Sequence, residues 1–361
     1  MKKYTDDIDR LCITPETSIH DAAERMERNR FGLCMVVDTE SILVGTVSDG
    51  DIRRAILNQA NMEQPVRKLL EIKKGTAYEQ SITGEIGLTE SAYIEIMNDR
   101  KVVHLPLVDK DGRLRDLVRM MDLVPAIRTP LRAVVMAGGK GSRLSPLTED
   151  VPKPMLPVGE RPLLEHIIGN LKDSGIHRVN VTTHYKAEMI ETHFGDGSEF
   201  GVELDYVSES EPLGTAGSLS LLDQSDEPLL VINGDVLTDL DIRAMLQFHV
   251  DSGAVMTVGV REYDVQIPYG VVECEGFNVV SIDEKPVKSF FVNAGIYLLH
   301  PTVRAHIPYG RRFDMTELMQ ILVDRKLPVA SFPIHEYWID VGRISDYERA
   351  QSEYAGKDSG K

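Results

Sequence analysis

The chain has 361 residues, too many for a single compact core, and its 42% apolar and 27% charged residues are ordinary for a globular protein. A net charge of −17 argues against a nucleic-acid partner held through its phosphates. No apolar run approaches the roughly 20 residues of a membrane span, and none follows the first lysines, so we expect neither a membrane partner nor a secretory leader.

The three cysteines point to a reducing, cytoplasmic setting. Cys12, Cys34 and Cys274 are far apart, odd in number and without CxxC spacing. This pattern fits neither a disulfide framework nor a thiolate zinc site. Cys12 and Cys34 stand among apolar residues, where we expect them to be buried as small hydrophobic side chains.

Charge and composition divide the chain near residue 128. Residues 1–128 hold 19 basic and 22 acidic residues, whereas the remainder holds 21 and 35. The segment PAIRTPLR at 125–132 contains two prolines and no clear periodicity, which is typical of a linker. We therefore expect two domains, 1–128 and 129–361.

The first block contains an approximate repeat of helix, strand, turn, strand and helix. A helix is expected at 19–29, with its apolar residues on one face, then strands at 33–38 and 42–48 and a helix at 49–57. Residues 88–124 repeat this order. Each copy alone would expose an apolar face, so we expect the two copies to pair.

The segment GTVSDGDIRR, which begins at Gly45, resembles a CBS (cystathionine-β-synthase) repeat, a regulatory module. The resemblance implies that Ser48 and Asp51 contact the phosphate and ribose of an adenine nucleotide. The expected regulatory partner is accordingly an adenine or guanine nucleotide bound to this tandem pair.

The second copy departs from this pattern at the positions that would touch a ligand. Asp116 stands where Gly45 stands and Arg119 where Ser48 stands, although Asp122 is retained. This argues against a second, equivalent site. Alternatively, both copies serve only to hold a dimer together. Paired repeats of this kind expose apolar edges, so we expect a homodimer or higher oligomer.

The second block alternates short β-rich runs with amphipathic helices. The runs include 133–139, 178–184, 229–235 and 255–260, and the helices at 161–175 and 241–253 end in glycine. This rhythm predicts an α/β fold whose doubly wound, mostly parallel sheet carries sites at the carboxyl ends of its strands. A smaller α+β region precedes it.

A glycine-rich turn follows the first of these strands. Gly138, Gly139 and Gly141 would let backbone N–H groups approach a polyphosphate. Arg143 and Lys153, the latter between two prolines, can neutralise phosphate charge. No GK[ST] closes the turn, so it is not a Walker A loop.

Two aspartates follow later β-rich runs. Asp235 ends LLVINGD, and Asp340 lies in EYWIDVG. Asp235 alone, directly after Asn-Gly, is best explained as an ordinary turn aspartate. Two carboxylates together offer the oxygen ligands that a hard cation prefers.

The order of these motifs with EPLGTAGSL at 211–219, PYGVVE at 268–273 and DEKP at 283–286 resembles the sugar-1-phosphate nucleotidyltransferases, which have a Rossmann-like, GT-A-like fold. The resemblance implies Mg²⁺ on Asp235 and Asp340, with Arg143, Lys153 and Lys285 as catalytic cations. It further implies nucleotide contacts from Ala137, Gly138, Gly139, Gly141, Ser142, Gly214 and Thr215, and sugar contacts from Gly270, Glu284 and Asn293. Ser142 replaces the family's usual threonine and keeps the hydroxyl.

Alternatives remain open at this stage. A buried-edge ion pair would also explain Glu284 and Lys285. The EPLGTAGSL loop faces the base in this family and resembles the guanylyltransferase branch, which implies GTP as donor, with glucosamine, mannose or heptose 1-phosphate as acceptor. A uridylyl-, thymidylyl- or cytidylyltransferase on the same fold is the first alternative, and a catalytically silent nucleotide sensor is the second. Retention of the charged site residues argues against the silent sensor.

Overall fold

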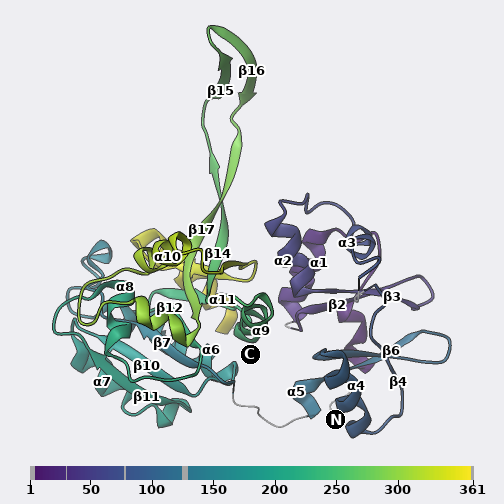
Figure 1. The fold of residues 1–361 in the computed structure, drawn as a ribbon, viewed down its shortest axis with the longest axis horizontal. Helices are drawn as coiled ribbons and strands as arrows, with labels where there is room; N and C mark the ends of the chain where they lie inside the picture. Colours follow the sequence, from purple (N-terminus) through teal and green to yellow (C-terminus); the bar gives the residue numbers. More distant parts are fainter. Residues whose placement is uncertain (1–4, 30, 77–78, 124–128, 359–361) are drawn as a thin grey trace. The chain divides into compact units, whose positions relative to one another are not determined.

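The structure is a computed structural model that comprises two compact units, 1–128 and 129–361, both drawn in Figure 1. It describes residues 5–29, 31–76, 79–123 and 129–358. The linker expected at 125–132 begins outside these described residues. Among the described helices, none is both long enough and apolar enough to cross a bilayer.

The N-terminal unit contains the same small sheet twice. The first sheet consists of β1 (Cys12–Ile13), β2 (Leu33–Val37) and β3 (Leu43–Ser48), and the second of β4 (Gly84–Glu85), β5 (His104–Val108) and β6 (Leu114–Arg119). In both sheets the first pair of strands is parallel and the second antiparallel. The ladders place Gly45 and Asp116 at equivalent positions, and likewise Ser48 and Arg119.

Short helices cover these sheets. They are η1 (Thr5–Leu11), α1 (Ile19–Asn29), α2 (Asp49–Leu57), α3 (Arg67–Ile72), α4 (Glu90–Arg100) and α5 (Met120–Leu123). The period-3.6 apolar pattern of α1 acts as expected, since Ile19, Ala22 and Met26 are buried against the first sheet. The α3 helix was not predicted from the sequence.

The C-terminal unit is built on a seven-stranded sheet ordered β11-β10-β7-β12-β17-β14-β18. Its strands are β7 (Arg132–Met136), β10 (Arg178–Thr183), β11 (Glu203–Ser208), β12 (Leu229–Asn233), β14 (Met256–Gln266), β17 (Val287–Leu299) and β18 (Val329–Pro333). Only β17 runs antiparallel to its neighbours. The predicted mostly parallel α/β sheet is therefore confirmed.

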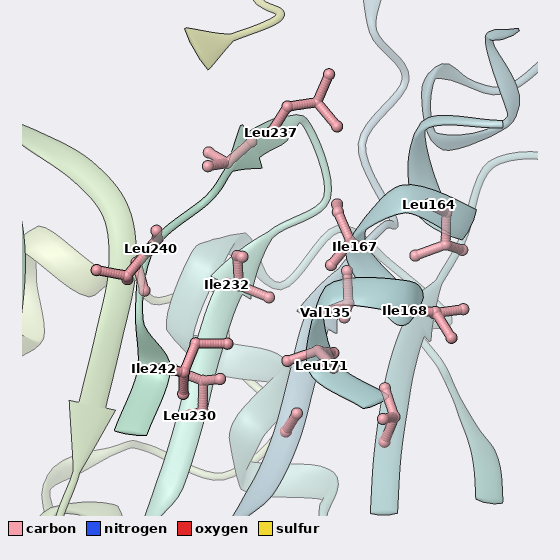
Figure 2. Packing of buried hydrophobic residues seen from close by; sticks show 14 of the residues in the cluster. Val135, Leu164, Ile167, Ile168, Leu171, Leu230, Ile232, Leu237, Leu240 and Ile242 are labelled. Carbon is pink, nitrogen blue, oxygen red and sulfur yellow. The ribbon is translucent and has the colours of Figure 1, made fainter. Parts of the chain in front are cut away.

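Both faces of this sheet are covered. The helices are α6 (Leu163–Asp173), α7 (Ala187–Phe194), α8 (Gly214–Gly217), α9 (Ile242–Ser252), α10 (Met315–Asp324) and α11 (Ile344–Asp358). Val135 and Ile232 pack with α6 in one core (Figure 2), whereas their neighbours Val134 and Val231 face a second core. Burial on both faces explains why these strands are uninterrupted apolar runs.

Two strands continue beyond the sheet as a ribbon. Residues 261–266 of β14 pair with 287–292 of β17, and the ribbon ends in the hairpin of β15 (Gly270–Glu275) and β16 (Asn278–Glu284). We call residues 261–292 the arm, which Figure 1 shows as a narrow projection from the unit. The sequence predicted a strand only at 255–260, so the extension was missed.

Candidate functional site

Close contacts shape the loop that follows β7. Gly141 has a φ of 64°, and a Cβ there would lie 2.9 Å from the Cβ of Lys153. The Gly234 N–H donates to the carbonyl of Met136 at 2.9 Å, and a Cβ on Gly234 would lie 2.6 Å from that oxygen. Only glycine permits either approach, so the loop is held against the segment that carries Asp235.

The remaining loop residues differ in exposure. Ala137 is buried, and its N–H donates to the carbonyl of Thr182 at 3.1 Å. Gly139 is exposed, with open space where a Cβ would stand. Ser142 and Arg143, in the 3₁₀ turn η2 (Ser142–Leu144), are exposed as well. The loop thus presents backbone, a hydroxyl and a guanidinium to solvent.

Lys153 and Asp235 form an ion pair across 82 residues of sequence. Lys153 begins the 3₁₀ turn η3 (Lys153–Met155) and is buried, with 9% of its surface exposed. The sequence placed Lys153 on phosphate oxygens, whereas in the structure its ammonium offsets the charge of Asp235. The ion pair also places the η3 turn, which carries Lys153, next to the residues that follow β12.

Asp340 lies beside this pair. The short strands β13 (Val236–Thr238) and β19 (Trp338–Asp340) place Val236 opposite Asp340. Enclosure by the surrounding protein and then the charge of Asp235 raise the pKa of Asp340 to about 6, although the side chain still reaches solvent. The cations Lys153 and Arg143 act in the opposite direction. Arg143, Lys153, Asp235 and Asp340 are thus close enough to interact electrostatically.

These two carboxylates fit a divalent cation. The like charge of Asp235 disfavours ionisation of Asp340, and a cation between them would offset this repulsion. Oxygen donors at the ends of adjacent strands are also the ligands that Mg²⁺ prefers. Asp235 and Asp340 are therefore the residues that would hold such an ion.

Glu209 is a site residue that the motifs did not reveal. It is buried, and its carboxylate accepts the Leu213 N–H at 2.9 Å. A Cβ on Gly138 would lie 3.2 Å from that carboxylate. Glu209 thus ties the glycine-rich loop to the segment leading into α8. The only signal in the sequence was an acidic residue two positions before the EPLGTAG segment.

The loop expected to face the base is fixed by α10. Gly214 has a φ of 77°, and a Cβ there would lie 2.5 Å from Oδ1 of Asp314. The Thr215 N–H donates to the same oxygen at 3.1 Å, and the Thr215 hydroxyl accepts the Met315 N–H at 2.8 Å. The glycine is therefore required by packing, and the Thr215 hydroxyl caps a helix in this structure.

The predicted sugar-contacting residues are divided between two places. Asn293 lies at the root of the arm, where its Nδ2 donates to the Tyr297 hydroxyl at 2.7 Å and its Oδ1 accepts the Gly295 N–H at 3.0 Å. A Cβ on Gly295 would lie 2.5 Å from Nδ2 of Asn233, the last residue of β12. Asn293 is therefore close to the strand end that leads to Asp235.

Gly270, Glu284 and Lys285 lie in the tip of the arm. Gly270 pairs with Glu284, and a Cβ on the glycine would lie 2.9 Å from the carboxylate. Lys285 follows with a φ of 52°. Glu284 and Lys285 are exposed, so the alternative of a buried ion pair is wrong. The structure brings these three residues together, but away from the two aspartates.

In the N-terminal unit, Ser48 and Asp51 contact each other. The Ser48 N–H and hydroxyl both donate to the Asp51 carboxylate at 2.8 Å and cap α2. Lys73 and Arg54 each lie 2.5 Å from the same carboxylate. A nucleotide at this position would have to compete with these partners.

The second copy fills the equivalent place differently. Arg119 donates two hydrogen bonds to Asp122, at 2.9 and 2.8 Å, and its guanidinium lies over the ring of Phe31. The substitution of serine by arginine therefore replaces a cap with a bidentate ion pair. This agrees with the expectation that the two copies are not equivalent.

Comparison with known proteins supports the two resemblances. A model of the nucleotidyl transferase family matches residues 132–357, and a CBS domain model matches residues 6–58, the first copy of the repeat. Over 241 residues the chain is 32% identical to a UTP–glucose-1-phosphate uridylyltransferase of Synechocystis, and over 230 residues it is 34% identical to a mannose-1-phosphate guanylyltransferase of Mycobacterium tuberculosis.

Each of these matches covers 61% of this chain, with 62% of the Synechocystis protein and 64% of the mycobacterial one. The chain thus spans less than two thirds of these relatives. A solved structure of HddC from Yersinia pseudotuberculosis, complexed with GMP-PN, aligns with a TM-score of 0.50 and 27% identity. That alignment covers 62% of this chain and 99% of the other.

Proposed function

We propose, since this chain belongs to the nucleotidyl transferase family, that its C-terminal unit transfers a nucleotidyl group from a nucleoside triphosphate to a sugar 1-phosphate. An oxygen of the sugar phosphate attacks the α-phosphorus, and the bond to pyrophosphate breaks. The products are a nucleotide-sugar and pyrophosphate. Because the nucleophile is already an anion, the reaction depends on positioning and charge neutralisation rather than on a strong base.

The observation that carries this proposal is the meeting of Arg143, Lys153, Asp235 and Asp340 beside the glycine-rich loop. Asp235 and Asp340 would hold Mg²⁺, which supplies neutralisation of triphosphate oxygens when bound. Arg143 is exposed and would bind the leaving pyrophosphate. Lys153 would contact both Asp235 and the phosphate oxygens, so its positive charge would offset the negative charge of both groups.

GTP is the donor that we propose, with a mannose-, glucosamine- or heptose-type acceptor. Support comes from the EPLGTAGSL loop and from mannose-1-phosphate guanylyltransferases among the relatives, while the uridylyltransferase relative marks the main alternative. The test is pyrophosphate release from a panel of triphosphates combined with a panel of sugar 1-phosphates, in Mg²⁺. A preference for UTP or dTTP above about tenfold in kcat/KM would reject the choice of GTP. No release from any pair would reject the transfer itself.

We also propose that an adenine or guanine nucleotide binds the N-terminal unit and modulates the transfer. The CBS match at 6–58 and the joined Ser48 and Asp51 support this. Calorimetry of the full chain with AMP, ADP, ATP, GMP, GDP and GTP, repeated on Asp51→Asn, tests it. Binding that is lost in the variant is expected, and no heat at millimolar nucleotide would leave only a structural role for the repeats.

A further inference from the structure

The arm exposes a large apolar surface. Its exposed apolar residues are Tyr263, Val265, Tyr269, Val272, Phe277, Val279, Val280, Ile282, Val287, Phe290 and Phe291. Tyr269 and Ile282 expose 74% and 70% of their surface. Apolar surface concentrated in this way marks a contact with another molecule or segment.

The arm also carries site residues that cannot reach the aspartates of their own chain in this structure. Six residue pairs separate the root at Asn293 from the tip, and at about 3.3 Å per residue they span roughly 20 Å. The Ile267 N–H donates to the Pro286 carbonyl at 2.9 Å, so the ribbon stays paired up to the tip. Lys285 lies beyond this bond, much farther than a lysine side chain extends.

The two halves of the site are complementary in composition. The core half holds the glycine-rich loop and the aspartates, together with cations suited to the triphosphate. The tip holds Lys285, the cation expected to bind the sugar phosphate, next to Gly270 and Glu284. A sugar 1-phosphate needs both halves, so the core site of one chain is incomplete in this structure.

We propose that the arm of one copy closes over the core site of a second copy, so that Gly270, Glu284 and Lys285 of one chain complete the site built around Asp235 and Asp340 of the other. The residue roles in this inference rest on the proposed function. Reciprocal exchange in a two-fold dimer leaves no arm unpartnered, and it covers the apolar residues of both arms. The alternative is closure onto the same chain by a bend at the β14 bulge between Val258 and Val260.

Cross-linking tests the placement of the arm without requiring activity. Two copies with different tags are co-expressed, one of them with Cys274→Ser, and the hetero-oligomer is purified through both tags. A photoreactive benzophenone is attached to Cys274, which is exposed in β15, whereas Cys34 is buried and Cys12 is half-buried.

The expected product is a covalent pair of chains on a denaturing gel, with the link mapped to residues around the core site of the second copy. Cys274→Ser in both copies is the control and should give no pair. A monomeric protein, or links confined to one chain, would overturn the inference in favour of closure within the chain.

Complementation tests whether the exchanged arm completes the site. One copy carries Asp340→Asn in the core and the other carries Lys285→Ala in the arm. If arms are exchanged, one site of each heterodimer has an intact core and an intact arm, so about half of the wild-type rate returns. If each arm serves its own core, both sites stay impaired and the rate remains at that of the parents.

A matched control is Lys288→Ala, which removes an exposed arm lysine outside the motif and should retain the wild-type rate. Links between chains without rescue would overturn the completion of the site. A wild-type chain that transfers nothing would reject the proposed function, and the cross-linking result alone would then decide whether the arm docks on a second copy.

Discussion

Asparagine substitutions at the two aspartates are expected to change stability in opposite directions, although both remove transfer. In metal-free protein, enclosure by the surrounding protein and then the charge of Asp235 disfavour the ionised Asp340 carboxylate, and its pKa of about 6 against 3.8 corresponds to roughly 3 kcal/mol. Because Asp340 reaches solvent, we reduce this to about 1 kcal/mol. Asp340→Asn should therefore raise the Tm of the C-terminal unit by about 2–4 °C in EDTA.

Asp235→Asn should instead lower the Tm. It leaves the buried ammonium of Lys153 without its anionic partner, while the amide oxygen still accepts a hydrogen bond. The expected cost is about 1–3 kcal/mol, or roughly 2–10 °C for a unit of this size. Scanning calorimetry in EDTA would measure both variants beside the wild type.

The pH dependence gives the sharper test. A carboxyl whose folded pKa is raised binds more protons in the folded state, so the wild type loses stability as pH rises from about 4 to 6. The cost is complete above pH 6. The gain from Asp340→Asn should accordingly be full at pH 8 and shrink as the pH falls through 6. A lowered Tm for Asp340→Asn at pH 8, or a gain independent of pH, would refute the repulsion between the two carboxylates.

Three further outcomes are expected. Gly141→Ala should cost about 1–3 kcal/mol in urea unfolding and raise the KM for the triphosphate, whereas Gly139→Ala, with open space around it, should change stability little; equal effects would contradict the packing argument. Thr215→Val should cost about 1–2 kcal/mol and Thr215→Ser much less, because serine keeps the hydroxyl that accepts the Met315 N–H at the start of α10. Cys274 should react with a thiol reagent at pH 8 within seconds, whereas Cys34, whose pKa burial raises to about 12, should react only on unfolding; rapid labelling mapped to Cys34 by mass spectrometry would show that this thiol is accessible.

The sequence was a good guide where one segment determines the outcome. The apolar run before Gly138 predicted the buried strand, and the glycines predicted the turn. The family resemblance implied that Asp235 and Asp340 lie near each other, and the ladder of β13 and β19 supplies the physical link. The predicted helix at 241–253 agrees with α9, whose N-cap is Asp241 and whose C-cap is Gly253.

The sequence was a poor guide where partners are distant. Nothing local indicates that Lys153 pairs with Asp235, or that the Cβ-free surface of Gly141 is needed for contact with Lys153 rather than for a phosphate alone. The alternation in residues 270–284 is compatible with strands, but it does not say what those strands pack against. Periodicity describes one face of one element, whereas the direction of the arm depends on contacts outside the segment.

The bond between Ile267 and Pro286 has a consequence for how this protein can diversify. The chain closes on itself before the tip begins, so the 18 intervening residues form a cassette whose two ends already meet. A different hairpin can be inserted there without altering the register of β14 and β17 or the packing beneath them. Under the proposed function, an exchange of this hairpin would change acceptor recognition and leave the residues that bind the triphosphate unchanged.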